Sequence, residues 1–494
     1  MIAGRLPRLA TAGLLMLAGG CGTPATSADD SAIDLVLTLA PAGAAAAPDP
    51  MAAPGVRYPR GSRVVLSDAD GRLEILSQGF AAAGAPALSP AGDEILFAAR
   101  RPEDGGWRVY RTDLRGGSPA AVSDPALDCI EPTFLAAGRI AFTCAVRTEG
   151  SPPSWSLYTA SSAGDGSERV TFGPGSARAP SALVDGRILF VMQSTGAAPP
   201  GLFTVNPDGT LLEAFVDSHS GDRAPIHVRE AVDGSVLALF LTSENGPRAE
   251  RFDGGAPMAP ARMVRLPDTD TDPAAGLVAL VPAGKGAALV VYSAPDAPSV
   301  AYLQREEGWS EVWASAADEK IVEVVVVTTR PAPRGRPRNV NLERRVGYLL
   351  GYDARRSDDS VGPPLGSPAP VRVHINTMRV GAARRPIGGG SGSEITESIS
   401  LGEAAVHDDG SFFVEVPADV PLRVATLDAN GTPVGQSGWF WVRPGEVRAC
   451  FGCHESRAAA PVNASVSAIR ADPVVLRAPV VATDLGAAPP GGGR

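Results

Sequence analysis

The sequence is poor in lysine, cysteine, histidine and aromatic side chains, and these shortages restrict the range of functions that it can have. Lysine occurs only at Lys285 and Lys320, the formal net charge is −10, and aromatic residues make up 5% of the 494 residues. Because an acidic chain does not complement the charge of a polyphosphate, we expect no nucleic-acid partner. The hydrophobic content of 44% still provides for a sizeable core, which argues against a largely disordered chain.

Long apolar runs are also missing, since no segment after Gly20 reaches the ~18 residues that a membrane helix needs. At the N-terminus, Arg5 and Arg8 precede a short apolar run at 9–18, which is the layout of a secretory signal. The run ends in Leu-Ala-Gly-Gly before Cys21 and resembles a bacterial lipoprotein signal. We therefore expect residues 1–21 to direct export and Cys21 to carry a lipid anchor in the cell envelope. The alternative is an ordinary export signal and a secreted protein.

Glycine and proline are abundant, with 56 and 46 residues, and both disfavour long helices, so an all-β fold is expected. A turn containing glycine, followed by a short β-branched strand, occurs four times. The corresponding positions are Ile95, Ile140, Ile188 and Val236, which are 45, 48 and 48 residues apart. Such a period is typical of propeller blades, because one blade has to stack on its neighbours to bury its faces.

The repeats resemble those of TolB-type propellers, whose turn is Ser-Pro-Asp-Gly. Ser89-Pro90-Ala91-Gly92 matches that turn with Ala91 in place of Asp. We therefore expect a β-propeller of about six blades over residues 60–345, with a pair of β-sandwiches as the alternative. Residues 22–59 are expected to form a flexible tether that contains one short isolated strand at 33–39.

Alternating apolar and polar residues predict a second β unit after about Gly347. Residues 371–375 read as a half-buried strand, 404–418 as strand, turn and strand, and 421–431 as a strand with a tight turn. We expect a small β-sandwich over residues 346–445, similar to transthyretin-like modules. Its Gly/Ser-rich stretch at 384–400 is expected to be a long loop.

The positions of the five cysteines are informative because there are so few. Cys129 and Cys144 flank one repeat turn in a chain that is expected outside the cytoplasm, where disulfides form. We expect a disulfide between them. The alternative is a pair of small buried thiols.

Cys450-x-x-Cys453-His454 is the attachment signature of c-type haem. Two thiols at this spacing reach the two vinyl groups of a porphyrin, and His454 then serves as proximal iron ligand. A zinc half-site would need further ligands nearby, and a redox disulfide would need a βαβ context. The sequence shows neither, so we expect one covalent haem c in residues 446–470, followed by a disordered tail at 471–494.

The sixth coordination position of the iron stays open. His374, His407 and Met378 are candidate distal ligands in the same unit, with His219 and His227 in the propeller as further candidates. A His or Met ligand suits electron transfer, whereas an empty position suits ligand binding or catalysis. Trp441 and Arg443 are expected to cover the ring and pair with a propionate. Alternatively, Trp439 and Trp441 belong to the sandwich core.

The order of propeller, sandwich, an aromatic stretch at 439–446 ending in Pro-Gly-Glu, and haem motif resembles proteins related to the alpha subunit of hydrazine synthase. Arg457 and Pro461, after the motif, add to this resemblance. It implies that Cys450, Cys453 and His454 bind haem. The enzyme's subunit carries more than one haem and has partner subunits, whereas this chain has one motif, so hydrazine synthesis is not predicted.

The expected function is that of a lipid-anchored monohaem c-type cytochrome. It would transfer electrons to a redox partner protein, with the propeller as a docking platform. One alternative is a haem enzyme with an open iron site. The sequence does not decide whether such an enzyme would be an oxidoreductase. A binding module with a structural or sensory haem is another.

Overall fold

The computed structural model describes residues 33–43, 49–103, 105–147, 153–194, 199–216, 223–242, 246–255, 260–267, 276–284, 286–294, 296–355, 369–380, 396–450 and 466–478. In these residues the fold is all-β, apart from one short helix, α1 (Pro54–Arg57), and one 3-10 turn, η1 (Ser467–Arg470). No helix of this part of the chain is long and apolar enough to cross a membrane.

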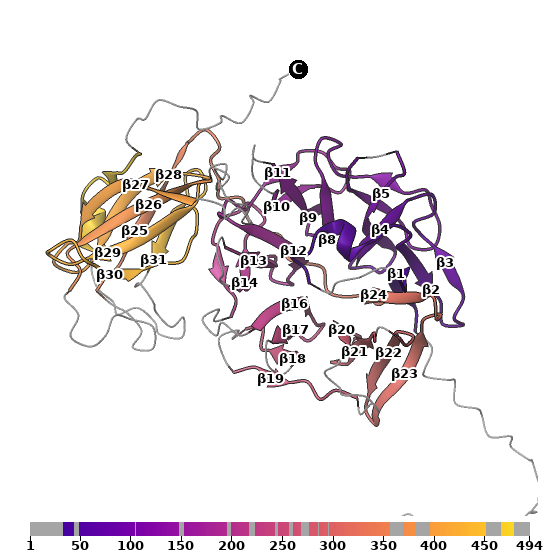
Figure 1. Ribbon diagram of the computed structural model, residues 1–494. Helices are drawn as coiled ribbons and strands as arrows, with labels where there is room; N and C mark the ends of the chain where they lie inside the picture. The colour runs from indigo at the N-terminus through magenta and orange to yellow at the C-terminus, as the bar shows by residue number, and fades with distance from the viewer. Residues whose placement is uncertain are drawn as a thin grey trace, which may run out of the picture.

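The larger body is a β-propeller whose sheets surround a common centre (Figure 1). Within the described residues its strands form six four-stranded sheets. The innermost strands of these sheets contact one another in a closed ring. The inner strands are β4 (Ala82–Leu88), β8 (Cys129–Phe134), β12 (Ser176–Ala182), β16 (Arg223–Glu230), β20 (Leu277–Pro282) and β24 (Glu319–Val326).

The outer strands follow each inner strand as antiparallel neighbours. They are β2 (Arg63–Ser67), β3 (Leu73–Ile75), β5 (Glu94–Arg100), β6 (Arg108–Asp113), β7 (Ala120–Ala121), β9 (Arg139–Val146), β10 (Ser154–Ser161), β11 (Glu168–Arg169), β13 (Ile188–Gln193), β14 (Gly201–Val205), β15 (Glu213–Ala214), β17 (Val236–Thr242), β18 (Gly246–Phe252), β19 (Arg262–Met263), β21 (Ala288–Tyr292), β22 (Val300–Arg305) and β23 (Gly308–Ala314).

The ring is closed by β1 (Leu35–Pro41), which lies between β24 and β2 and pairs antiparallel with both. Leu37 is opposite Val324 on one side and Val65 on the other, and all three side chains are buried. Residues 33–39 were expected to form an isolated strand in a flexible tether. In the structure this strand is instead part of a propeller sheet. The strand stays in the propeller because its apolar side chains pack against the valine-rich β24.

The predicted repeat corresponds to the second strand of four consecutive sheets, β5, β9, β13 and β17. Each of these strands follows a turn that contains a glycine with positive φ, for example +81° at Gly92 and +79° at Gly234. Side chains other than glycine rarely adopt this conformation, which explains the recurrence of glycine. The aligned apolar positions Ile95, Ile140, Ile188 and Val236 are all fully buried.

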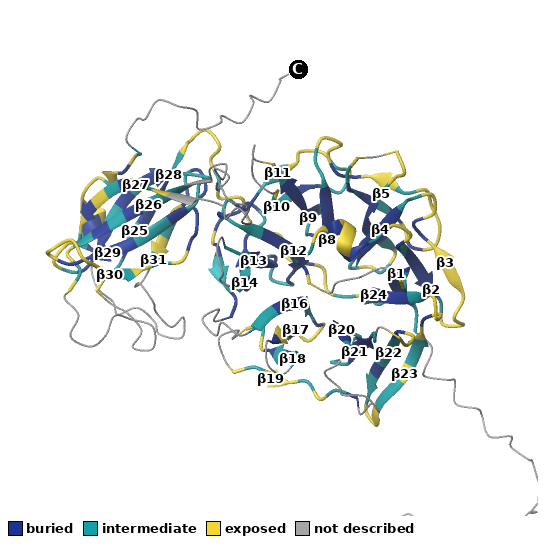
Figure 2. Ribbon diagram, in the orientation of Figure 1, coloured by how far each residue is buried: buried dark blue, intermediate teal, exposed yellow. Residues whose placement is uncertain are grey.

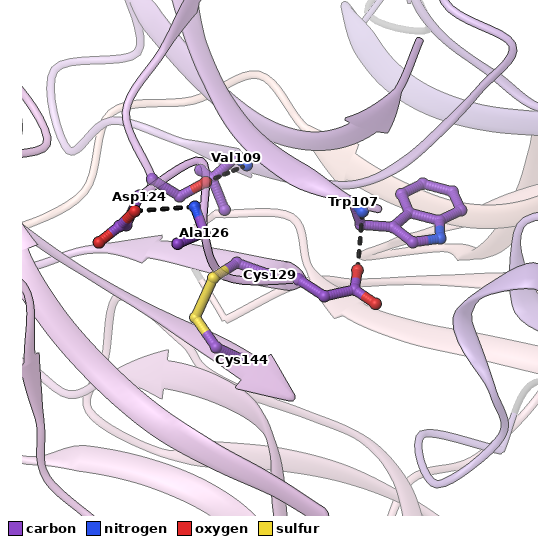
Figure 3. Close-up of a disulfide and its surroundings, with 8 residues drawn as sticks. Trp107, Val109, Asp124, Ala126, Cys129 and Cys144 are labelled. Carbon is purple, nitrogen blue, oxygen red and sulfur yellow. Dashed lines mark hydrogen bonds between the residues drawn. A yellow bond between two sulfur atoms is a disulfide. The ribbon is translucent and has the colours of Figure 1, made fainter. Parts of the chain in front are cut away.

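A disulfide joins Cys129 at the start of β8 to Cys144 in β9 (Figure 3). The two residues are direct partners in the antiparallel pairing of these strands, and both are fully buried. The carboxylate of the preceding Asp128 accepts a hydrogen bond from the backbone N–H of Trp107 at 2.7 Å. The crosslink therefore fixes an inner strand of the propeller to its neighbour.

Four buried charged side chains meet at the centre of the propeller. Arg57 of α1 donates to Glu131 at 2.6 Å and to Glu323 at 2.5 Å, and Nε of Arg178 lies 3.0 Å from Glu131. The hydroxyl of Tyr58 also donates to Glu323, at 2.8 Å. Two positive and two negative charges balance each other here, which a buried ionic cluster requires. This central ion cluster holds the N-terminal segment inside the ring.

The smaller body is a β-sandwich of two four-stranded sheets, drawn in orange and yellow in Figure 1. Its core joins Leu349 and Val414 from one sheet to Val373 and Ile375 from the other. Buried and half-buried residues alternate along the strands at 346–351 and 412–417, as expected of strands that turn one face to the core (Figure 2). The first sheet holds β31 (Val447–Cys450), β25 (Val346–Gly351), β28 (Phe412–Pro417) and β32 (Val474–Val475); the second holds β27 (Thr396–Ala405), β26 (Arg372–Val380), β29 (Leu422–Leu427) and β30 (Pro433–Gln436).

The boundaries of the sandwich differ from the expected ones in two places. β27 begins at Thr396, inside the stretch 384–400 that was expected to be a loop. β31 and β32 extend the sandwich beyond residue 445, and Leu476 in the expected disordered tail is 4% exposed. The pairing partners of these strands are distant in sequence, so their local composition did not reveal them.

Candidate haem-attachment site

Cys450 is the last residue of β31, which runs parallel to β25 and pairs with it from Tyr348 to Gly351. Its carbonyl accepts a hydrogen bond from the backbone N–H of Tyr352 at 2.9 Å. Its thiol is half-buried and takes part in no disulfide. A fixed backbone with an accessible thiol fits covalent attachment of a haem vinyl group. Cys453 and His454 lie outside the described residues.

The chain returns to the same end of this sheet after the motif. Gly351 pairs with both Cys450 and Phe412, so the end of β31 lies level with the start of β28. The backbone N–H of Ser467 donates to Asp409 at 2.6 Å, and that of Ala468 donates to the hydroxyl of Ser411 at 3.0 Å. The segment that carries Cys453 and His454 is therefore anchored at both ends beside the turn at 407–411.

The turn at 407–411 joins β27 to β28 and is held by its own polar side chains. Burial alone would raise the pKa of Asp409, but hydrogen bonds from Ser411 and Ser467 lower it well below its ordinary range. The carboxylate is consequently ionised at neutral pH and acts as a fixed acceptor. It ties the returning chain to the turn.

Among the candidate distal ligands, His407 lies in this turn, and its side chain is exposed. His374 in β26 is opposite Glu403, near the end of β27 that leads into the turn, and its Nε2 lies 2.8 Å from the hydroxyl of Ser400. Met378 is four residues further along β26, toward the other end of the sandwich. The topology thus brings His407 to the end of the sheet where Cys450 lies.

The two candidates in the propeller are differently placed. His227 in β16 is buried near the central ion cluster, where burial, Arg229 and Arg57 lower the pKa of its imidazole well below the ordinary value. His219 lies outside the described residues. A buried neutral imidazole in the centre of the propeller does not share a surface with Cys450.

Trp441 and Arg443 occupy a different place from the predicted haem contact, because both are 1% exposed between the sandwich and the propeller. The indole N–H of Trp441 donates to the carbonyl of Gly209 at 2.9 Å. Arg443 forms ion pairs with Glu168 of the propeller and with Asp419 of the sandwich, each at 2.9 Å. The two side chains dock one domain against the other and have no surface left for a porphyrin.

The same interface fixes the strand that leads to the motif. Glu446 accepts hydrogen bonds from the backbone N–H groups of Leu211 at 3.0 Å and Arg443 at 2.7 Å. Arg448 donates to the carbonyl of Leu212. β31 therefore rests on the propeller loop at 206–212 and enters the motif from a rigid support. This role of Glu446, the last residue of the Pro-Gly-Glu stretch, was not predicted from the sequence.

Burial of the interface also affects its acidic groups. Burial raises the pKa of Asp419 to about 6, even though Arg443 and Arg169 lower it in part. Burial likewise raises the pKa of Glu446, against two hydrogen bonds that lower it.

In the part of the chain that the structure describes, no group of three or more His, Cys, Asp or Glu side chains could hold a separate metal ion.

Comparisons with known proteins agree with this architecture. Residues 372–455, from the start of β26 to the residue after His454, match the family model of the hydrazine synthase alpha subunit middle domain. The structure is similar to Kuenenia stuttgartiensis hydrazine synthase, with a TM-score of 0.72 and 18% identity over 89% of this chain and 71% of that one. This likeness shows a shared fold across both domains.

TolB from Acinetobacter baumannii also matches, with a TM-score of 0.43 and 13% identity over 60% of this chain and 66% of its own. A comparison with curated proteins finds no match.

Proposed function

Because this chain is related to the alpha subunit of hydrazine synthase, we propose that it is a c-type haem protein. One haem is attached through Cys450 and Cys453, with His454 as proximal ligand. The position of Cys450 supports this most strongly, since a half-buried thiol that forms no disulfide ends a docked strand. The anchoring of both ends of the motif segment beside the turn at 407–411 adds to it.

The function that we propose is electron transfer by a monohaem cytochrome of the cell envelope. A bound haem c supplies one-electron redox chemistry. His407 is the distal ligand in this proposal, because its turn and the motif segment share one end of the sheet. The propeller, whose six sheets we take as six blades, would dock a redox partner protein.

The alternative is a haem enzyme with an open iron position. This alternative fits the structure about as well as the cytochrome does. His407 is exposed on its turn, so its side chain is not held toward the motif by a described contact. The relative of known structure is itself named as an enzyme, hydrazine synthase. The two proposals differ in whether the ferrous protein binds carbon monoxide.

We expect the His407→Ala variant to gain carbon monoxide binding that the wild-type ferrous protein lacks. Removing the imidazole opens the sixth position, which magnetic circular dichroism of the ferric protein reports independently. His374→Ala is the matched control, because Nε2 of His374 already contacts Ser400. Carbon monoxide binding by the wild type would favour the enzyme, and an unchanged spectrum in His407→Ala would exclude His407 as the ligand.

The cell-envelope location rests on the N-terminal segment, which lies outside the described residues. We propose that Cys21 carries a lipid anchor. The wild-type chain should then sediment with the membrane fraction, and Cys21→Ser should move to the soluble fraction. A wild-type chain found only in the soluble fraction would contradict the anchor.

A further inference from the structure

A cavity of about 110 Å³ lies at the centre of the propeller, beside the central ion cluster. All six inner strands or the residues that follow them line it. Glu131 and Glu323 of the ion cluster are followed directly by cavity residues, Pro132 and Val324. The cavity therefore lies directly beside the central ion cluster, whose own charges are balanced.

Two arginines of this cavity, Arg229 and Arg330, form no direct ion pair within the described residues, although the charges of Glu323 and Glu230 act on them from a longer distance. Arg229 of β16 donates to the backbone carbonyl of Val228 at 2.8 Å, and Arg330 reaches the carbonyl of Leu88 only at 3.5 Å. Burial lowers the pKa of Arg330 and the neighbouring Arg229 lowers it further, because the two positive charges repel each other, while Glu230 raises it in part. Both guanidinium groups still carry their charge at neutral pH.

The acidic neighbour of these arginines is already engaged. Glu230 accepts a hydrogen bond from the backbone N–H of Val184 in the adjacent sheet. Burial raises the pKa of this carboxyl group, which shows that its surroundings disfavour the charged form. With Glu230 ionised, the three side chains carry one net positive charge.

We propose that this cavity is a binding site for a small monocarboxylate, held by Arg229 and Arg330. A guanidinium group presents paired N–H donors that match the two oxygens of a carboxylate. One net positive charge is neutralised by a monoanion, whereas a phosphate dianion would leave excess negative charge in a partly buried site. The walls suit a short apolar body, since they include Pro86, Pro180 and Val281.

The site also lies where the linker to the sandwich begins. Arg330 follows β24, and its backbone N–H donates to the carbonyl of Pro90 at 3.0 Å. Further along, the N–H of Arg334 donates to the carbonyl of Val184 at 2.9 Å, on a different sheet. The linker therefore runs between two sheets over this side of the propeller and contributes one of the two arginines.

The test uses the full chain and butyrate as the probe, followed by ligand-observed NMR at pH 7. We expect saturable binding to the wild type. Arg229→Gln and Arg330→Gln should each weaken it at least about tenfold, because each loses charged hydrogen bonds to the carboxylate. Arg334→Gln is the matched control, since Arg334 is exposed on the same linker and does not line the cavity.

A second variant separates binding from folding. Val232 lines the rim of the cavity and is 43% exposed, so Val232→Glu adds a negative charge without opening the core. It should weaken butyrate binding while thermal unfolding stays unchanged. The proposal would be overturned if butyrate did not bind to the wild type, if both arginine variants bound butyrate as tightly as the wild type, or if inorganic phosphate bound more tightly than butyrate.

Discussion

Replacing Glu131 with Gln is expected to lower the free energy of unfolding by about 3–5 kcal/mol, because breaking a buried ion pair from one side leaves an unpaired charge. Glu131 is 5% exposed and bridges Arg57 and Arg178, whose side chains are 5% and 0% exposed. Its loss leaves two buried guanidinium groups with Glu323 as the remaining carboxylate. The N-terminal segment then loses one of its two ionic contacts at the centre of the propeller.

Chemical denaturation measures this effect, and tryptophan fluorescence is a suitable probe because the guanidinium of Arg178 lies 4.7 Å from the ring of Trp155. Glu94→Gln is the matched control. The side chains of its ion pair with Arg111 are 27% and 33% exposed, so we expect a loss below about 1 kcal/mol. The double variant Glu131→Gln with Arg178→Met restores the charge balance and should lose less than the sum of the single variants.

The pH dependence gives an independent check of the same cluster. Burial alone would raise the pKa of Glu131, but Arg178 and Arg57 lower it below its ordinary value of 4.5. A lowered pKa contributes stability that is present above 4.5 and is lost as the pH falls further. The acid unfolding of Glu131→Gln should therefore be shallower than that of the wild type. An equally steep acid transition in both proteins would contradict the ionic role.

Much of the propeller follows from local sequence. The glycine turns and the buried Ile or Val after them predict the second strands, since both features depend on neighbouring residues alone. The closure does not follow in this way, because β1 finds its partner β24 almost 300 residues later. Residues 33–39 are short and flanked by polar and Ala/Pro-rich stretches, so only the complementary edge of β24 identifies them as part of the ring.

The stretch before the haem motif shows why a site can be assigned to the wrong contact. Aromatic and basic side chains such as Trp441 and Arg443 suit a porphyrin and its propionates as well as they suit a domain interface. Which of these contacts the two side chains make depends on Glu168 and Gly209, which the fold brings from the propeller. Gly209 has φ of +85°, and a β-carbon there would lie 2.4 Å from the guanidinium of Arg443, so the close approach requires glycine.

The position of the haem motif was predictable, and its surroundings were not. Cys450-x-x-Cys453-His454 is recognised by spacing alone. His407 comes near Cys450 because β25 pairs with both β28 and β31. No local sequence pattern contains the register of these pairings. For the same reason, the role of Asp409 in holding the returning chain at Ser467 could not be anticipated.

Loss of covalently attached haem is the second large effect that we expect. The Cys450→Ser, Cys453→Ser double variant should lose all covalently bound haem, because each thioether requires one of these thiols. Its fold should persist, since Cys450 ends an edge strand and its side chain makes no disulfide. Far-UV circular dichroism should therefore match that of the wild type.

The most direct measurement is the haem content of the full chain after export in a host that matures c-type cytochromes. We predict that acid–acetone extraction leaves one haem per wild-type chain and none on the Cys450→Ser, Cys453→Ser variant, as read from the pyridine haemochrome spectrum. A folded wild-type protein that retains no haem after this extraction would show that Cys450 and Cys453 do not attach haem covalently.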